Sequence, residues 1–188
     1  MAETQYLALL RGINVGGKNI IKMTDLKACF ESLGLSDVTT FIQSGNVVFR
    51  SADRNKASLT AGIEKALSER FLYLSRIMLH SDRELKKVIE SAPEGFGAKP
   101  DLYRYDVIFL KEPLTAREAM KSIRTKEGVD TAHAGKQVLY FSRLTSKAAQ
   151  SYLTRMITLP IYQNMTIRNW NTTTKLLDLM EKRKSNEA

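Results

Sequence analysis

A chain of 188 residues has room for one domain or for two small ones packed together. Its apolar content of 43% and charged content of 26% are ordinary for a globular protein and exclude global disorder. No apolar run is long enough to cross a bilayer, and Met1–Glu3 shows neither a basic segment nor a cleavage site for secretion. We therefore expect a cytoplasmic protein with no membrane partner.

The charge balance is strongly basic, with 29 Lys and Arg against 20 Asp and Glu and a formal net charge of +9. Such an excess favours association with phosphorylated ligands, nucleic acid or other anions, but it identifies none of them. The single cysteine, Cys29, excludes an intramolecular disulfide. It stands beside Phe30 in an apolar helical pattern, which indicates a buried thiol.

The first half of the chain alternates short apolar runs with helical periodicity. Ser81 and Glu84 have the spacing of a capping box, which opens a further helix after the last run. The predicted order is βαββαβ followed by that helix. Strands are expected at residues 6–10, 38–42, 47–49 and 76–79, and helices at residues 24–33 and 59–71.

Residues 93–100 hold two prolines and two glycines and interrupt the pattern. We divide the chain there, into a first half at 1–93, a linker at 94–100 and a second half at 101–188. The second half repeats the order of elements, with Thr115 and Glu118 in capping-box spacing. Its strands are expected at residues 105–110, 131–134, 138–141 and 166–168, and its helices at residues 115–123, 146–156 and 172–180.

Repetition of one supersecondary unit predicts an α/β (α+β) protein formed by tandem duplication of a ferredoxin-like βαββαβ unit, each copy with a trailing helix. The runs Leu7–Leu10, Val107–Leu110 and Val138–Phe141 are apolar at nearly every position. A strand with one face in solvent should alternate apolar and polar residues, so these continuous runs predict that both faces of each sheet are buried. The trailing helices, or the two halves packing on each other, would cover the second face.

Two polar loops stand out. The segment from Arg11 to Asn19 follows the first strand and holds three glycines, two cations and two asparagines, and Gln43–Asn46 forms the turn of the first hairpin. In a split βαβ unit the first strand points toward the hairpin that joins the second and third strands. Both loops are therefore expected at one end of the sheet, where function concentrates.

The spacing from Gly12 to Lys18 fits that of a phosphate-binding P-loop, but Asn19 stands where a magnesium-binding Ser or Thr belongs, and the residues after it read as extended. A weaker function survives, in which Gly16 and Gly17 present backbone N–H groups to an anion. The alternative is a flexible loop whose glycines only permit a turn.

The segment Arg168–Lys175 contains the only tryptophan, Trp170, just before a helix. Asn171 or Thr172 could cap that helix, and its free N–H groups could then face an anion. The structural alternative makes Trp170 a packing anchor. We also expect Arg168 or Asn171 to lie within hydrogen-bonding reach of the loop from Gly12 to Lys18.

The leading hypothesis is a binding module for an anionic small ligand that carries phosphate or carboxylate. The expected ligand-binding residues are Arg11, Asn14, Gly16, Gly17, Lys18, Gln43, Ser44, Asn46, Arg168 and Asn171.

Two alternatives remain open. Nonspecific nucleic-acid binding would use the net charge, with Trp170 or the tyrosines stacking on bases. An enzyme using Ser44 or Lys18 covalently ranks last, because no activating base accompanies either residue and no catalytic residue can be named. His80 and His133 have no metal-like spacing, so neither a metal nor a cofactor is expected.

Several blocks resemble an uncharacterised bacterial family, domain-of-unknown-function family 1697. The resemblance spans nearly the whole chain. It implies a bacterial protein with two ferredoxin-like halves and supplies neither an activity nor catalytic residues. The matching blocks are Leu9–Asn19, Ile21–Met23, Phe41–Phe49 and Arg168–Thr172.

Overall fold

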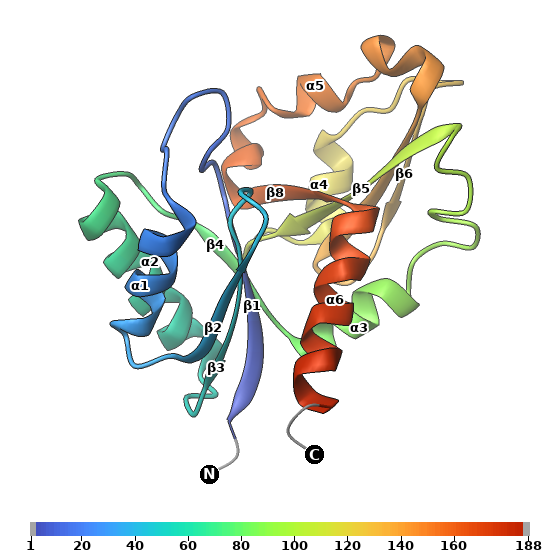
Figure 1. Cartoon of the computed structure of the whole chain (residues 1–188). Coiled ribbons are helices and arrows are strands. Elements are labelled where there is room, and N and C mark those ends of the chain that lie inside the picture. Colours follow the sequence, from blue (N-terminus) through green and yellow to red (C-terminus); the bar gives the residue numbers. More distant parts are fainter. Residues whose placement is uncertain (1–2, 186–188) are drawn as a thin grey trace. The chain divides into compact units, whose positions relative to one another are not determined.

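The protein contains two four-stranded antiparallel sheets, seen in a computed structural model that describes residues 3–185 (Figure 1). The strand orders are β2-β3-β1-β4 and β6-β7-β5-β8, so the second sheet repeats the topology of the first. This confirms the predicted duplication of a ferredoxin-like unit. The described chain divides into two compact units, one formed by residues 3–85 with residues 178–185, the other by Lys86–Leu177.

In the first sheet β1 is central and antiparallel to both β3 and β4, with Leu9 opposite Asn46 and Leu10 opposite Ile77. The end of β1 therefore lies beside the start of β3 and the start of β4. The elements are β1 (Thr4–Leu10), α1 (Met23–Glu31), β2 (Ser36–Phe41), β3 (Asn46–Ser51), α2 (Lys56–Phe71), β4 (Ile77–Ser81) and α3 (Asp82–Glu90).

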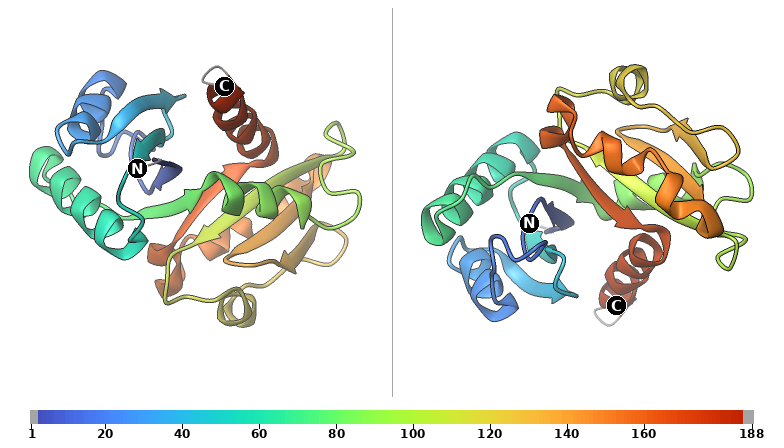
Figure 2. Two further views of the ribbon diagram at one scale, coloured as in Figure 1. Left: turned by 90° about the horizontal axis from the view of Figure 1, so that it is seen from below. Right: turned by 90° about the horizontal axis from the view of Figure 1, so that it is seen from above.

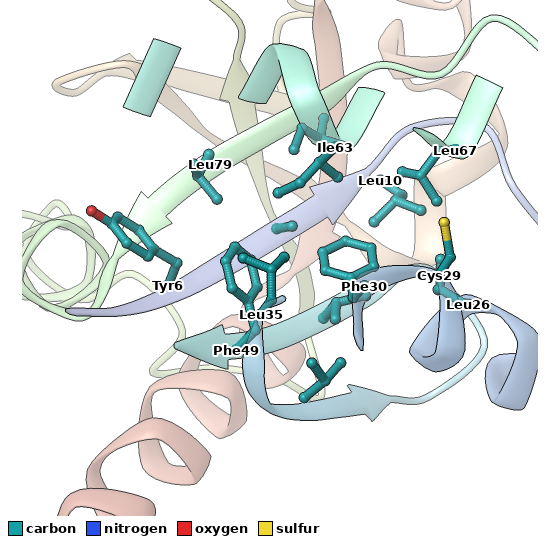
Figure 3. Close-up of a cluster of buried hydrophobic side chains, with 14 of the residues drawn as sticks. Tyr6, Leu10, Leu26, Cys29, Phe30, Leu35, Phe49, Ile63, Leu67 and Leu79 are labelled. Carbon is teal, nitrogen blue, oxygen red and sulfur yellow. The ribbon is translucent and has the colours of Figure 1, made fainter. Parts of the chain in front are cut away.

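Helices α1 and α2 cover one face of this sheet and lie side by side (Figure 2). Their apolar side chains meet every second residue of β1, because alternate strand residues point to one face. Phe30 of α1 packs edge-on against Phe49 of β3, with ring centroids 5.4 Å apart. The sulfur of Cys29 lies in the same cluster (Figure 3), and burial raises the pKa of its thiol. The predicted buried thiol is confirmed.

The second unit has the same plan. Its core lies between one face of the sheet and the helices α4 and α5. Thr115 and Glu118 form the predicted capping box at the start of α4. The elements are β5 (Tyr103–Leu110), α4 (Ala116–Ser122), β6 (Asp130–Ala134), β7 (Val138–Leu144), η1 (Thr145–Gln150), α5 (Leu153–Met156), η2 (Pro160–Asn164), β8 (Met165–Asn169) and α6 (Trp170–Ser185).

The other face of the second sheet is also buried, as the continuous apolar strands predict. The hydroxyl of Tyr140 in β7 donates to the carbonyl of Val88 in α3 at 2.6 Å. Phe96 packs edge-on against both Tyr140 and Trp170, at centroid distances of 5.4 and 5.1 Å. Trp170 is thus a packing anchor in its own unit.

Two predictions for the second half are wrong in detail. The helix expected at residues 146–156 is broken into η1 and α5, because the chain is extended at Ser151 and the carboxylate of Asp130 accepts the next N–H, that of Tyr152, at 2.8 Å. Helix α6 begins at Trp170 and is capped by Asn169, whose side-chain oxygen accepts the N–H of Thr172 at 2.7 Å. Neither Asn171 nor Thr172 is the cap.

The end of α6 belongs to the first unit. The guanidinium of Arg183 donates to the backbone carbonyl of Asp37 at 2.7 Å and also contacts the side chains of Asp37 and Thr39. The ammonium of Lys184 pairs with Asp82. Among residues 3–185 the structure has no helix that could span a membrane.

Candidate functional site

The loop after β1 and the turn between β2 and β3 lie together at one end of the first sheet. The N–H of Leu10 donates to the carbonyl of Gly45 at 2.8 Å, and the amide of Asn14 donates to the carbonyl of Gln43 at 3.0 Å. The connection from α2 to β4 lies at the same end, because the N–H of Arg11 donates to the carbonyl of Arg76 at 3.0 Å. Residues 11–22, 42–45 and 72–76 form what we call the loop end of the first sheet (Figure 1).

Asparagines fix the path of the long loop. Asn14 has a positive φ of 53°, and its side-chain amide donates to Ile21 and Gln43 while its oxygen accepts the N–H of Ile21 at 2.8 Å. Asn19, at φ 48°, donates to the carbonyl of Gly12 at 2.8 Å. Both N–H groups of the Asn14 amide are therefore used within the protein, and this side chain has a structural role.

Gly16 and Gly17 form the tip of the loop. Their φ values of 59° and 74° suit a two-residue turn, closed by the N–H of Lys18 donating to the carbonyl of Val15 at 3.1 Å. Both glycines and Lys18 are exposed, and within residues 3–185 the structure shows no hydrogen bond from the N–H groups of Gly16 and Gly17. Helix α1 begins only at Met23, so the tip is not at a helix N-terminus as it would be in a P-loop.

The shorter turn is packed tightly beneath the loop. Gly45 is buried at φ 73°, where a Cβ atom would lie 2.8 Å from the Cβ of Leu10 and 2.9 Å from the Cδ1 of Ile13. Asn46 is fully buried and donates to the carbonyl of Phe41 and to the hydroxyl of Ser44, both at 2.9 Å. Gln43 is the exposed member of this turn.

The same connections also carry exposed apolar side chains, which the sequence alone did not indicate as a group. They come from all three connections, so no local pattern marks them as a set. Val15, Ile20, Ile42, Leu72 and Leu74 are between 50% and 91% exposed.

Two of these apolar residues also occupy a strained backbone conformation. Ile42 has φ 48° and Leu72, at the C-terminal end of α2, has φ 54°. The left-handed region costs a non-glycine residue about 1–2 kcal/mol, and a β-branched residue there is a genuine outlier. Gly or Asn would fit both positions better, so exposure and strain coincide at the loop end.

The loop end also has a one-sided charge. Its three connections contain Arg11, Lys18, Lys22 and Arg76 and no Asp or Glu. The carboxylate of Glu64 in α2 reaches the edge of this region, where it accepts the N–H of Ile77 at 2.8 Å. The local field is therefore dominated by cations, which suits an anionic partner.

The two expected ligand residues of the second half lie at the junction of β8 and α6. Arg168 is buried, which lowers its pKa to about 10, and it donates to the hydroxyl of Thr166 and the carbonyl of Ile167, both at 2.8 Å. Asn171 is exposed, and its carbonyl accepts the hydroxyl of Thr174. Their expected contact with the glycine-rich loop joins the two units and stays a prediction.

In the described residues no group of three His, Cys, Asp or Glu side chains lies close enough to hold a metal ion. His80 is buried in β4, and burial lowers its pKa to about 4, so it is neutral at physiological pH. His133 lies in β6, in the other unit. The arrangement at the loop end thus offers hydrogen-bond donors, positive charge and apolar surface.

The chain belongs to the family described as protein of unknown function DUF1697, whose profile matches residues 3–140. A similar solved structure is that of the conserved bacterial protein SP0830 from Streptococcus pneumoniae. It is 28% identical, with a TM-score of 0.83, and the alignment covers 94% of this chain and 98% of that one. No curated protein matches.

Proposed function

We propose that this DUF1697 protein binds an anionic small ligand, bearing phosphate or carboxylate, at the tip of the glycine-rich loop. The observation that carries the proposal is the exposed turn at Gly16 and Gly17, with positive φ at both residues, followed directly in the chain by the exposed cation Lys18. Successive backbone N–H groups in a turn form an anion-binding concavity, and a neighbouring cation strengthens each contact. The proposed location is the cytoplasm.

The rigidity of the loop supports this proposal. Asn14 and Asn19 make four hydrogen bonds within the loop and one, from Asn14 to Gln43, to the neighbouring turn, all between 2.8 and 3.1 Å long. A loop held in one conformation loses little entropy when a ligand binds. Within the expected set, Asn14 and Asn46 act as supports for this conformation. Arg11, Lys18, Gln43 and Ser44 remain as the side chains proposed to meet the ligand.

The test is a thermal-shift screen of the full chain with inorganic phosphate, nucleotides, sugar phosphates and dicarboxylates. A compound that binds only the native state raises the Tm as its concentration rises. We expect Lys18→Ala to remove this shift without changing the Tm of the unliganded protein, because Lys18 is exposed. Arg11→Ala should weaken the shift.

Lys136→Ala is the matched control, since Lys136 is exposed in the β6–β7 turn, the counterpart in the second sheet of the β2–β3 turn. This variant should keep the full shift. The proposal fails if no anionic compound raises the Tm, or if Lys18→Ala responds like the parent protein.

Nonspecific nucleic-acid binding is the second candidate, and the run of cations without acids at the loop end favours it. Fluorescence anisotropy with a labelled oligonucleotide should then show affinity that falls steeply as salt rises, because phosphate contacts release counterions. The ring of Trp170 is half-buried against Phe96, which argues against a stacking role for it. Salt-insensitive affinity would exclude this candidate.

A further inference from the structure

We infer that the loop end of the first sheet docks on an anionic lipid bilayer, with Val15, Ile20, Ile42, Leu72 and Leu74 entering the interface. The inference shares the cations Arg11 and Lys18 with the proposed function but requires no free ligand. It starts from two observations that a small-anion site does not explain. Five large apolar side chains are 50–91% exposed on three adjacent connections, and two of them are held at strained positions.

The three connections that carry these side chains are adjacent, because hydrogen bonds join them. Arg11 is bonded to Arg76, Leu10 to Gly45 and Asn14 to Gln43, all at 2.8–3.0 Å. The three connections therefore present their apolar residues from one end of one sheet. Scattered exposed apolar residues are normal on a protein surface, but a group surrounded by polar residues marks an interaction site.

The backbone strain at two of these positions indicates that their apolar side chains have a function. Ile42 and Leu72 occupy left-handed backbone, where Asn or Gly would be more stable and would also remove an exposed apolar side chain. Neither the folding stability nor the solubility of the protein explains an isoleucine and a leucine here. Backbone strain that lowers stability and adds exposed apolar surface indicates a function of the side chains themselves.

The charges decide the kind of partner. Arg11, Lys18, Lys22 and Arg76 accompany the apolar residues, and no acid lies in the three connections. A second copy of this chain docked through the same end would bring these cations against their own equivalents, which disfavours a symmetric dimer. An anionic bilayer has negative headgroups above an apolar layer. The cations can therefore pair with the headgroups while the Ile and Leu side chains enter the apolar layer.

The origin of the apolar residues favours a bilayer over a folded protein partner. They come from a turn, a loop and a helix end, and each is at least 50% exposed. Insertion of separate side chains into a fluid interface requires no complementary surface, whereas a protein interface is packed to the density of an interior. The absence of a long apolar run, from which no membrane partner was expected, excludes a spanning segment and not a docking surface.

The experiment is cosedimentation of the full chain with vesicles of phosphatidylcholine, with and without phosphatidylglycerol. We expect binding only when phosphatidylglycerol is present, and weaker binding at high salt. Ile42→Asn and Leu72→Gly should each lower the partition coefficient by roughly tenfold, because each removes one inserted side chain. Lys22→Ala should lower it by roughly fivefold.

The variants separate a binding role from a folding role. Ile42→Asn and Leu72→Gly relieve backbone strain, so their Tm should equal or exceed that of the parent while vesicle binding falls. Ile20→Ser, at 78% exposure and without a positive φ, tests the same surface without touching a strained position. Leu33→Asn is the control, since Leu33 is 40% exposed in the turn before β2, at the opposite end of the same sheet.

The outcomes also separate this inference from the proposed function. The apolar variants leave Gly16, Gly17 and Lys18 in place, so a thermal shift by small anions should survive in them. Vesicle binding without any small-anion shift would leave the docking inference standing and remove the proposed function. The inference is overturned if the chain binds neither kind of vesicle, as a site for an acidic protein would predict, or if Leu33→Asn loses as much binding as Ile42→Asn.

Discussion

The side-chain amide of Asn14 donates to the backbone carbonyl of Gln43 at 3.0 Å, which joins the glycine-rich loop to the β2–β3 turn. The same amide also makes two hydrogen bonds with Ile21, donating to its carbonyl and accepting its N–H. Two loops that are separated in sequence thereby become one rigid region. The proposed anion site depends on that rigidity.

Asn14→Ala should lower the free energy of unfolding by about 2 kcal/mol, because three hydrogen bonds are lost and alanine must adopt φ 53°. Urea denaturation measures the change. Gln43→Ala is the matched control, since the Gln43 acceptor is its backbone carbonyl and its side chain is exposed. That variant should stay within about 0.5 kcal/mol of the parent. Equal losses would show that the Asn14 amide does not hold the loop.

Gly45→Ala should be far more damaging than Gly17→Ala, although both glycines have φ near 74°. At Gly17 nothing lies within 4 Å of an added Cβ, so only the left-handed conformation costs energy, about 1 kcal/mol. At Gly45 the added atom also meets Leu10 at 2.8 Å and Ile13 at 2.9 Å, and a loss above about 2 kcal/mol is expected. The Tm values of the two variants make the comparison, and similar values would contradict the packing described here.

Acid should destabilise the protein through His80. Burial holds its pKa near 4, against an ordinary value of 6.5, so the native state binds fewer protons than the unfolded state between these values. The contribution of about 3 kcal/mol is complete above pH 6.5 and is lost as the pH falls to 4. His80→Gln should flatten the pH dependence of the free energy of unfolding in this window. An unchanged slope would exclude His80 as its source.

A second group, Glu84, acts at lower pH. Burial raises its pKa, but hydrogen bonds from Lys56 and Ser81 outweigh that effect and the net pKa is lowered. Its stabilisation is therefore present above the ordinary value of 4.5 and is lost below it. The His80 variant should keep this further loss, which separates the two groups.

Gly97→Ala should disturb the single tryptophan. A Cβ at this position would lie 2.3 Å from the indole nitrogen of Trp170, and the backbone is at φ 87°. Either the indole or the segment around Gly97 must shift, which should change the emission maximum of Trp170 and lower the Tm. Gly95→Ala is the control, because Gly95 has φ 75° and nothing within 4 Å of an added Cβ. An unchanged spectrum in Gly97→Ala would contradict the described packing.

The sequence was sufficient for the order of elements, because periodicity and capping residues act locally. Ser81 with Glu84, and Thr115 with Glu118, mark helix starts through bonds within four residues. The helix expected at 146–156 fails for the opposite reason. The carboxylate that accepts the N–H of Tyr152 belongs to Asp130, which lies outside the helix segment. The sequence pattern of residues 146–156 therefore contains no sign of this bond.

Burial of both faces of each sheet could be predicted from the continuous apolar strands, because water on one face would require polar residues at alternate positions. The glycines and asparagines of the loop likewise indicate a backbone that can adopt positive φ. Which elements share a unit depends on contacts between residues far apart in the sequence, since the end of α6 joins the first unit through Arg183 and Asp37. The tertiary structure alone gathered Ile20, Ile42 and Leu72 at one end of a sheet, because strand pairing, and not sequence distance, places their connections side by side.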